Sequence, residues 1–284
     1  MKYKMLYLLI STIIIGAGLF SVVKWGYVLS IDFIGGTNLE YQLPMPMDKK
    51  VIEDTFKKEN IEIVTYNQKD NVVSIRTKTL TEQKEGAVRK SIETKIKNKI
   101  TVLKFETVGP VLGRETMIKT GIASLVAILG ILLYMTFAFK GLNFALAAII
   151  ALLHDFFVVI GTYSLFSHFL GAQVDTLFVT ALLTTMSFSV HDTIIIFDKI
   201  REYKKKEGLI DIEASSNKAL METLVRSLNN SITIMFMLVA LVLLGGTTIR
   251  FFALTLLVGT ITGTYSSPFV AVPVLIWLEK RRKG

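Results

Sequence analysis

The sequence predicts an α-helical membrane protein with six transmembrane helices. A ferredoxin-like (βαββαβ) α+β domain, extracytoplasmic, is expected between helices 1 and 2. The first observation is that the 284 residues are 51% hydrophobic with a mean hydropathy of +0.53, too apolar for a soluble protein of this length. The second is that apolar runs long enough to cross a bilayer recur along the chain. The third is a polar interval after the first run, in which strand and helix patterns follow one another.

The composition excludes several classes of function. A net charge of +9 would suit a nucleic-acid-binding protein, but Lys and Arg cluster beside apolar runs, where anionic lipid and membrane topology explain them. The absence of cysteine excludes disulfides, thiolate catalysis and cysteine metal sites. The three histidines form no HxxxH or HExxH pair, so no zinc site is predicted. We therefore expect no cofactor, no bound metal, no nucleic-acid partner and no enzyme activity.

Residues 1–25 are predicted to form transmembrane helix 1. The apolar run Met5–Val23 follows Lys2 and Lys4, and it is longer than the core of a signal peptide and lacks a small-residue cleavage site. We interpret it as an uncleaved helix with Lys24 and Trp25 at the far interface.

Residues 26–115 are predicted to form the ferredoxin-like domain, in which two helices cover one face of a sheet. This fold supports many functions, so a binding or spacing module is the best prediction from the pattern alone. Paired glycines mark the two junctions with the membrane helices, Gly35 with Gly36 and Gly109 with Gly113, as turns or hinges. In chain order the predicted elements are the strand Thr37–Leu43, a helix capped by Asp48 and ending at Lys58, the hairpin strands Ile61–Tyr66 and Val72–Arg76 turned at Gln68–Asn71, a helix from Thr81 to Lys99 and the strand Thr101–Thr107.

Residues 116–284 are predicted to form a five-helix transmembrane domain with short connections, so consecutive helices are antiparallel neighbours. Pro268 and Pro273 are expected to kink or end the last helix. A surface helix over Asp211–Asn230 is predicted to lie along the cytoplasmic face before the fifth span. The predicted spans are 117–139, 142–166, 174–197, 228–248 and 251–278.

The distribution of Lys and Arg among the short loops predicts the orientation. One side carries Lys2, Lys4, Lys140, the loop from Lys199 to Arg226 and the basic end of the chain. The other side has Ser167–Gln173, which has neither residue type, and the turn at Arg250. Short cytoplasmic loops are enriched in Lys and Arg. Both termini are therefore predicted to be cytoplasmic, with domain 26–115 outside the cytoplasmic (inner) membrane of a bacterium.

Asp192 is the principal candidate site residue. It lies in the apolar segment Thr184–Glu202, and helical rise places it about 10 Å inside Lys199. Thr185, Ser189 and Asp192 share one helix face. An ionised side chain at this depth costs ~3 kcal/mol or more, so it faces protein or a water-filled cavity. Two interpretations stay open, an ion or proton path and a buried acid that hydrogen-bonds a neighbouring helix.

Further polar residues in the spans are weaker candidates for a relay or for packing: His154, Asp155, His191 and Asp198. Arg226 shares a helix face with Thr233, and on general grounds we favour an interface anchor that reaches lipid phosphate. Gly259 and Gly263 form a GxxxG pair typical of close helix packing.

Several motifs agree in order and spacing with one family. They are DFIGGT at Asp32–Thr37, VGPVLGRE at Val108–Glu115, ALLHD at Ala151–Asp155, SVHDTIIIFDKIRE at Ser189–Glu202, ETLVRSLNNSIT at Glu222–Thr233 and LLGGTTIRFFALTLLVGTITGTYSS at Leu243–Ser267. The chain thus resembles the SecD/SecF family of protein-export membrane subunits over nearly its whole length. The short interval between DFIGGT and VGPVLG favours the SecF branch, since SecD carries a much larger outer domain.

The resemblance implies an energy-coupling function in the Sec translocase. SecD and SecF form a pseudo-symmetric pair of the RND superfamily that uses the proton-motive force, or sodium in some relatives, to assist export by SecA and the SecYEG channel. The matching relay positions are Asp192 and Arg226, which reverses the preference for an interface anchor, and the remaining Asp belongs to SecD. His191 replaces the Asn of many relatives.

Two other functions compete with this interpretation. The chain could be a passive scaffold that links SecD to the channel and to the insertase YidC, with the polar helix face used only for packing. A small-molecule RND exporter is disfavoured, because the chain has no large porter domain. The client range, the stoichiometry and the coupling ion do not follow from the sequence.

Overall fold

The computed structural model describes residues 4–139, 141–206 and 211–283, in two compact units. One unit is Leu29–Gly121, and the other comprises Met1–Val28 and Ile122–Gly284. Lys2 and Lys140, which contribute to the predicted orientation, lie outside the described residues.

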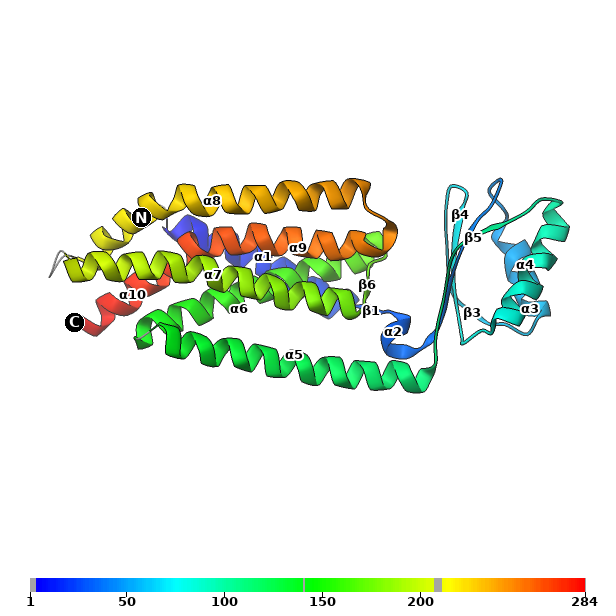
Figure 1. Ribbon diagram of the computed structural model, residues 1–284, viewed down its shortest axis with the longest axis horizontal. Coiled ribbons are helices and arrows are strands. Elements are labelled where there is room, and N and C mark those ends of the chain that lie inside the picture. Colours follow the sequence, from blue (N-terminus) through cyan, green and yellow to red (C-terminus); the bar gives the residue numbers. More distant parts are fainter. Residues whose placement is uncertain (1–3, 140, 207–210, 284) are drawn as a thin grey trace. The chain divides into compact units, whose positions relative to one another are not determined.

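The first unit contains one antiparallel sheet in the order β3-β4-β2-β5, with α3 and α4 on one face (Figure 1). This arrangement confirms the predicted α+β fold. Before it lie β1 (Val28–Leu29), at the boundary of the units, and the short α2 (Ile31–Ile34). The elements of the sheet and its helices are β2 (Gly36–Gln42), α3 (Lys49–Lys58), β3 (Ile63–Lys69), β4 (Val72–Thr77), α4 (Glu82–Ile96) and β5 (Thr101–Val108).

Alternation along the central strands produces the core of this unit. Leu39 and Tyr41 of β2 are buried against the two helices, together with residues of β4. The helix side of the core is made by Ile52, Phe56, Val88 and Ile92. As predicted, Asp48 caps α3, because its carboxylate accepts a hydrogen bond from the Lys50 backbone nitrogen at 3.0 Å.

The hairpin has a longer first strand and a shorter turn than predicted. Strand β3 begins at Ile63 and continues to Lys69, which pairs with Val72, so the turn contains only Asp70 and Asn71. Asp70 has a φ of 53°, a left-handed conformation that Asp tolerates better than most residues. The predicted turn was wrong because polar residues of this exposed edge strand do not show where pairing stops.

Two of the four junction glycines, Gly35 and Gly113, lie against each other. Gly35 has a φ of 74°, and a Cβ added to it would lie 2.7 Å from the Pro110 Cα. A Cβ on Gly113 would lie 2.7 Å from the Gly35 nitrogen. The segment before β2 and the segment after β5 therefore approach so closely that a side chain at either glycine would clash.

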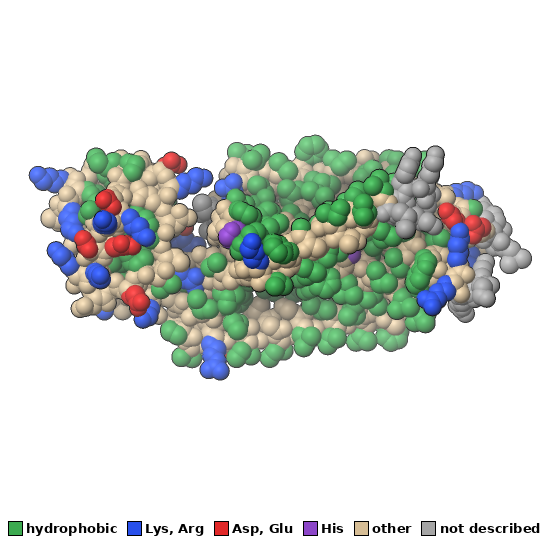
Figure 2. Space-filling view, turned by 180° about the vertical axis from the view of Figure 1, so that it is seen from behind, with side chains coloured by type: hydrophobic (Ala, Val, Ile, Leu, Met, Phe, Trp, Pro, Cys, Tyr) green, Lys and Arg blue, Asp and Glu red, His purple; other side chains and the backbone are tan. Residues whose placement is uncertain are grey.

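Six helical segments of the described chain are long and apolar enough to cross a membrane, as predicted, and the chain is a multi-pass membrane protein. Hydrophobic side chains cover the sides of the helical unit, and charged side chains gather where α7 and α10 end (Figure 2). The elements are α1 (Lys4–Trp25), α5 (Pro110–Ala138), α6 (Leu142–Leu170), β6 (Gln173–Val174), α7 (Thr176–Lys206), α8 (Ile212–Leu244), α9 (Thr247–Ser266), the π-helical turn η1 (Ser267–Ala271) and α10 (Val272–Lys283).

The ends of the last two spans differ from the prediction. Helix α8 is continuous, without a separate surface helix, because no Gly or Pro interrupts Ile212–Leu244. The sixth span includes α9, η1 and α10, and Pro268 lies in the π-helical turn. Proline lacks a backbone N–H, and the wider turn accommodates it without ending the span.

Small residues bring the helices of this unit together. A Cβ on Gly18 of α1 would lie 2.8 Å from the Gly161 Cα of α6. Gly259 and Gly263 of α9 lie against α7, where an added Cβ would be 2.3 Å from the Thr185 Cβ and 3.2 Å from the Ser189 Cα, respectively. Close approach of this kind is how membrane helices associate when lipid is as apolar as the helix surface.

Candidate functional site: a polar cavity beside Asp192

Asp192 projects from α7 towards α8. Only 7% of the residue is exposed, and the Ser227 hydroxyl of α8 donates a hydrogen bond to its Oδ2 at 3.0 Å. Thr185 and Ser189, on the same face of α7, are buried as well. The polar face predicted from spacing therefore lies against protein, as the cost of polar groups in hydrocarbon requires.

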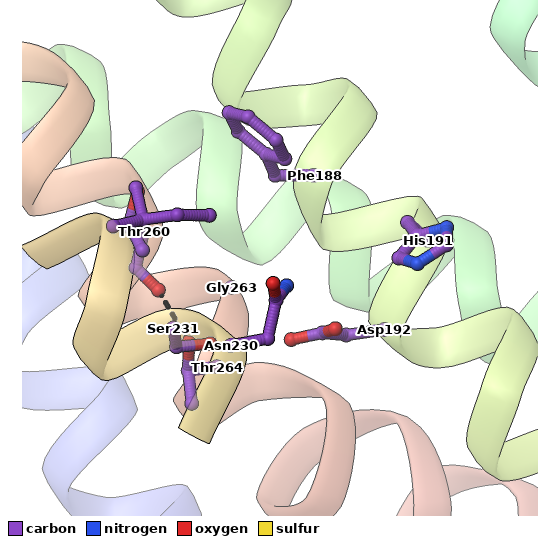
Figure 3. A pocket seen from close by; sticks show the side chains of 9 residues that line it. Phe188, His191, Asp192, Asn230, Ser231, Thr260, Gly263 and Thr264 are labelled. Carbon is purple, nitrogen blue, oxygen red and sulfur yellow. Dashed lines mark hydrogen bonds between the residues drawn. The ribbon is translucent and has the colours of Figure 1, made fainter. Parts of the chain in front are cut away.

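A cavity of about 20 Å³ lies beside the Asp192 carboxylate. This is room for one water molecule or a small ion. In Figure 3 the Asn230 side chain points towards the carboxylate. Across the cavity, the Thr264 hydroxyl donates to the Ser231 Oγ at 2.7 Å. The lining comes from α7, α8 and α9: Phe188, His191, Asp192, Asn230, Ser231, Ile234, Thr260, Gly263 and Thr264.

Arg226 does not join this cavity. Its side chain is exposed on α8, and it has no hydrogen bond or ion pair with a described residue. Its neighbour Ser227 contacts Asp192, and consecutive residues of a helix point about 100° apart. The structure thus places Arg226 on the outer surface of α8 and does not bring it to Asp192.

His154 and Asp155 are brought together in the interior of the helical unit. His154 is 7% exposed and Asp155 is 3% exposed, and the His154 Nδ1 lies 2.8 Å from the Asp155 Oδ1. The Asp155 Oδ2 accepts hydrogen bonds from the hydroxyls of Ser189 on α7 and Ser266 on α9. This cluster joins α6, α7 and α9.

The two remaining candidates lie at the surface. His191 is exposed and contributes to the wall of the cavity. Asp198, near the end of α7, forms an ion pair of 3.1 Å with Arg201, and its side chain is 63% exposed. That environment gives Asp198 no role in a buried site.

Sequence reasoning missed the residues that complete both acidic sites. Ser227, Asn230 and Ser266 lie inside the family motifs Glu222–Thr233 and Leu243–Ser267, but they are common polar residues to which the motifs gave no role. Ser227 is adjacent to the candidate Arg226, and Asn230, three residues further on, shares a helix face with Ser227. A helical wheel of α8 could therefore have found both residues.

Residues 88–281 match the family described as protein export membrane protein SecD/SecF, C-terminal. The chain belongs to the SecD/SecF family. It is 36% identical to the protein translocase subunit SecF of Anaerolinea thermophila, over 96% of this chain and 92% of that protein. It is 37% identical to the protein translocase subunit SecF of Thermobaculum terrenum, over 99% of this chain and 93% of that protein. The similarity confirms the SecF branch predicted from the motifs.

A solved structure of the same family has the same fold. The crystal structure of SecDF from Thermus thermophilus, described as a translocon-associated membrane protein, matches with a TM-score of 0.84 and 28% sequence identity. The match covers 99% of this chain and 38% of the SecDF chain, so this chain spans less than half of that protein. A super-membrane-facing form of SecDF matches with a TM-score of 0.62.

Proposed function

We propose that this chain is an energy-coupling SecF subunit, which acts with SecD to assist SecA- and SecYEG-driven protein export at the outer face of the membrane. The observation that carries the proposal is the buried Asp192 carboxylate beside a polar cavity inside membrane-spanning helices. A carboxylate next to a water-sized space can take up and release an ion while the surrounding helices exclude bulk water.

The cavity chemistry suits either a proton or a sodium ion as the coupling ion. Protonation would remove the charge of Asp192 and let the carboxyl donate a hydrogen bond. Sodium would instead be held by oxygen atoms, which the carboxylate, Asn230 and the hydroxyls of Ser231 and Thr264 supply around the cavity. Both ions change the charge beside α8 and α9, and this change is the proposed driving event.

The partner is inferred from polar side chains exposed on the surface of the spans. His191, Arg226 and Asn230 are exposed on α7 and α8, within the membrane-spanning segments. Polar groups facing lipid are costly, so protein covers them. We assign SecD as the protein that covers these side chains, with the Asp of SecD as the partner of Arg226. The longer SecDF chain, of which this chain matches 38%, supports a joint membrane domain.

The proposed orientation has both termini in the cytoplasm. Helix α7 ends in Lys204, Lys205 and Lys206, and the last helix ends in a basic segment, which favours the cytoplasmic side. The ferredoxin-like unit would then contact the emerging polypeptide on the outer face, and YidC is a further candidate partner. A scaffold without ion coupling is the competing function.

The test is export into inverted vesicles that contain SecD, with the pH and sodium gradients collapsed separately. Stimulation of export by the chain should disappear when one of the two gradients is collapsed and persist when the other is collapsed. Asp192→Asn should abolish this stimulation while assembly with SecD is retained. Asp198→Asn is the matched control, because this exposed acid of the same helix should leave stimulation intact. Normal stimulation by Asp192→Asn would leave the scaffold as the function.

A further inference from the structure

Three polar side chains surround the Asp155 carboxyl group within hydrogen-bond distance. Its Oδ2 accepts from two hydroxyls, that of Ser266 at 2.6 Å and that of Ser189. Its Oδ1 faces the His154 Nδ1 at 2.8 Å, and the imidazole donates there in its Nδ1–H tautomer. A carboxylate that accepts three hydrogen bonds is stabilised in its charged form.

A negative charge at this position calls for a compensating positive charge. Asp155 is 3% exposed on a membrane-spanning helix. Unpaired charge at such depth is costly. The groups that hydrogen-bond it within the described chain are two hydroxyls and one imidazole, and no Lys or Arg is among them. His154 is therefore the group that can supply the charge.

The second nitrogen of His154 is available for a proton. The Nε2 is buried and has no hydrogen-bond partner in the described part of the chain. Once Nδ1–H donates to Asp155, Nε2 of the neutral ring carries a free lone pair. Nε2 has no partner within the described residues in either protonation state, and a proton there turns the ring into the missing cation.

The other titratable groups on the packed helices do not replace His154 in this role. On α9, the Tyr265 ring centroid is 6.2 Å from that of His154, and its hydroxyl donates to the Tyr7 carbonyl of α1. On α7, Asp192 bonds Ser227 and His191 is exposed. On α10, Glu279 is held by Asn143 at 2.7 Å and Lys204 at 2.8 Å.

We propose that His154 and Asp155 form a second proton-binding site, in which Asp155 stays ionised and the proton binds the Nε2 lone pair of His154. Neutral imidazole becomes imidazolium, no other bond breaks, and the net charge of the pair rises from −1 to 0. Ser189 lies one helical turn before Asp192 on α7, so this site and the Asp192 cavity share a helix. The use of the His154–Asp155 site in export rests on the proposed function, but the protonation of His154 does not.

The direct test is nitrogen NMR of ¹⁵N-histidine-labelled chain in the SecD complex in lipid. The chain has three histidines, and the His154 signals are assigned by their loss in His154→Gln. Both ring nitrogens of His154 should be protonated at about pH 6, and the Nε2 should be unprotonated at about pH 9. In Asp155→Asn the ring should be neutral at both values. A ring that is neutral at both values in the unaltered chain, or unaffected by Asp155→Asn, would overturn the proposal.

The Asn variant separates proton binding from packing. Its amide oxygen can accept from both serines and its amide nitrogen can donate to His154 Nδ1, so every hydrogen bond of the cluster has a replacement. Asp155→Asn should assemble with SecD yet lose most gradient-dependent stimulation. Full stimulation together with an unchanged His154 spectrum would reduce the cluster to packing. Failure of Asp192→Asn to affect export would refute the proposed function and leave the His154 spectrum as an independent result.

Discussion

Two His-Asp pairs lie on neighbouring helices, and their surroundings are opposite. His154 and Asp155 of α6 are hydrogen-bonded to each other in the interior, and the hydroxyls of Ser189 and Ser266 also hydrogen-bond the Asp155 carboxylate. On α7, His191 is exposed, and Asp192 accepts a hydrogen bond from one described residue, Ser227, beside a cavity of about 20 Å³. The same dipeptide thus gives an enclosed carboxyl group with three hydrogen-bond partners in one helix and an open site in the next. The difference comes from how completely neighbouring helices cover each position.

The largest expected effect comes from removing the ferredoxin-like unit, which leaves both pairs in place. Deletion of Asn38–Thr107 with a short bridge should abolish stimulation of export, because the proposed contact with the polypeptide is lost. The helical unit should still insert, since its own core lies in residues outside the deletion. Export and protease protection in inverted vesicles measure the two outcomes. Full stimulation by the deletion would assign the contact to SecD alone.

Alanine substitutions should separate the two acids by stability. Asp155→Ala strands three donors in the interior and should lower the free energy of unfolding by about 3 to 5 kcal/mol. Asp192→Ala removes one hydrogen bond beside a cavity that water can fill, so about 1 kcal/mol is expected. Thermal unfolding in one detergent compares them. Equal losses would contradict the distinction between an enclosed and an open site.

Arg226 tests the open site from its outer side. Guanidinium stays protonated and binds carboxylate through a planar fork, whereas a buried Lys can lose its proton. Arg226→Ala should therefore reduce gradient-dependent stimulation about tenfold or more, and Arg226→Lys should be impaired less, both with SecD still bound. Export measured for both variants at matched expression levels distinguishes the two roles of Arg226. Unaltered export by Arg226→Lys would make Arg226 an interface anchor.

A smaller effect is expected where the two sites share a helix contact. A Cβ on Gly263 would lie 3.2 Å from the Ser189 Cα, so Gly263→Ala should push α9 from α7 by a few tenths of an ångström. Gly130→Ala is the matched control, since nothing lies within 4 Å of its added Cβ. We expect about a twofold loss of stimulation for Gly263→Ala alone. Equal export by both variants would show that this contact does not influence Asp192.

The sequence predicted what depends on local pattern. The strand patterns of Ile61–Tyr66 and Val72–Arg76 and the cap at Asp48 predicted elements of the sheet unit, and the polar face of Thr185, Ser189 and Asp192 predicted a buried site. Each of these features depends on residues that are close together in the sequence, so periodicity is sufficient to find them.

The sequence did not predict what depends on contact between distant segments. Ser189 and Ser266 meet at one Asp155 oxygen although 77 positions separate them, and neither is unusual in a membrane helix. The continuity of α8 was missed because its amphipathic first half resembles a surface helix, although no Gly or Pro separates it from the second half. Such outcomes are decided by tertiary packing, which local pattern does not encode.

The π-helical turn at Ser267–Ala271 has a mechanical consequence. Its wider backbone bond, from the Val272 nitrogen to the Ser267 oxygen, breaks the rotational phase between α9 and α10. Ser266 and Ser267 are adjacent but bond different helices, Asp155 of α6 and Thr193 of α7. The end of α9 and the turn are thus tied to α6 and α7 through consecutive hydroxyls, whereas α10 is tied to the same two helices separately, through Glu279, which accepts from Asn143 of α6 and Lys204 of α7.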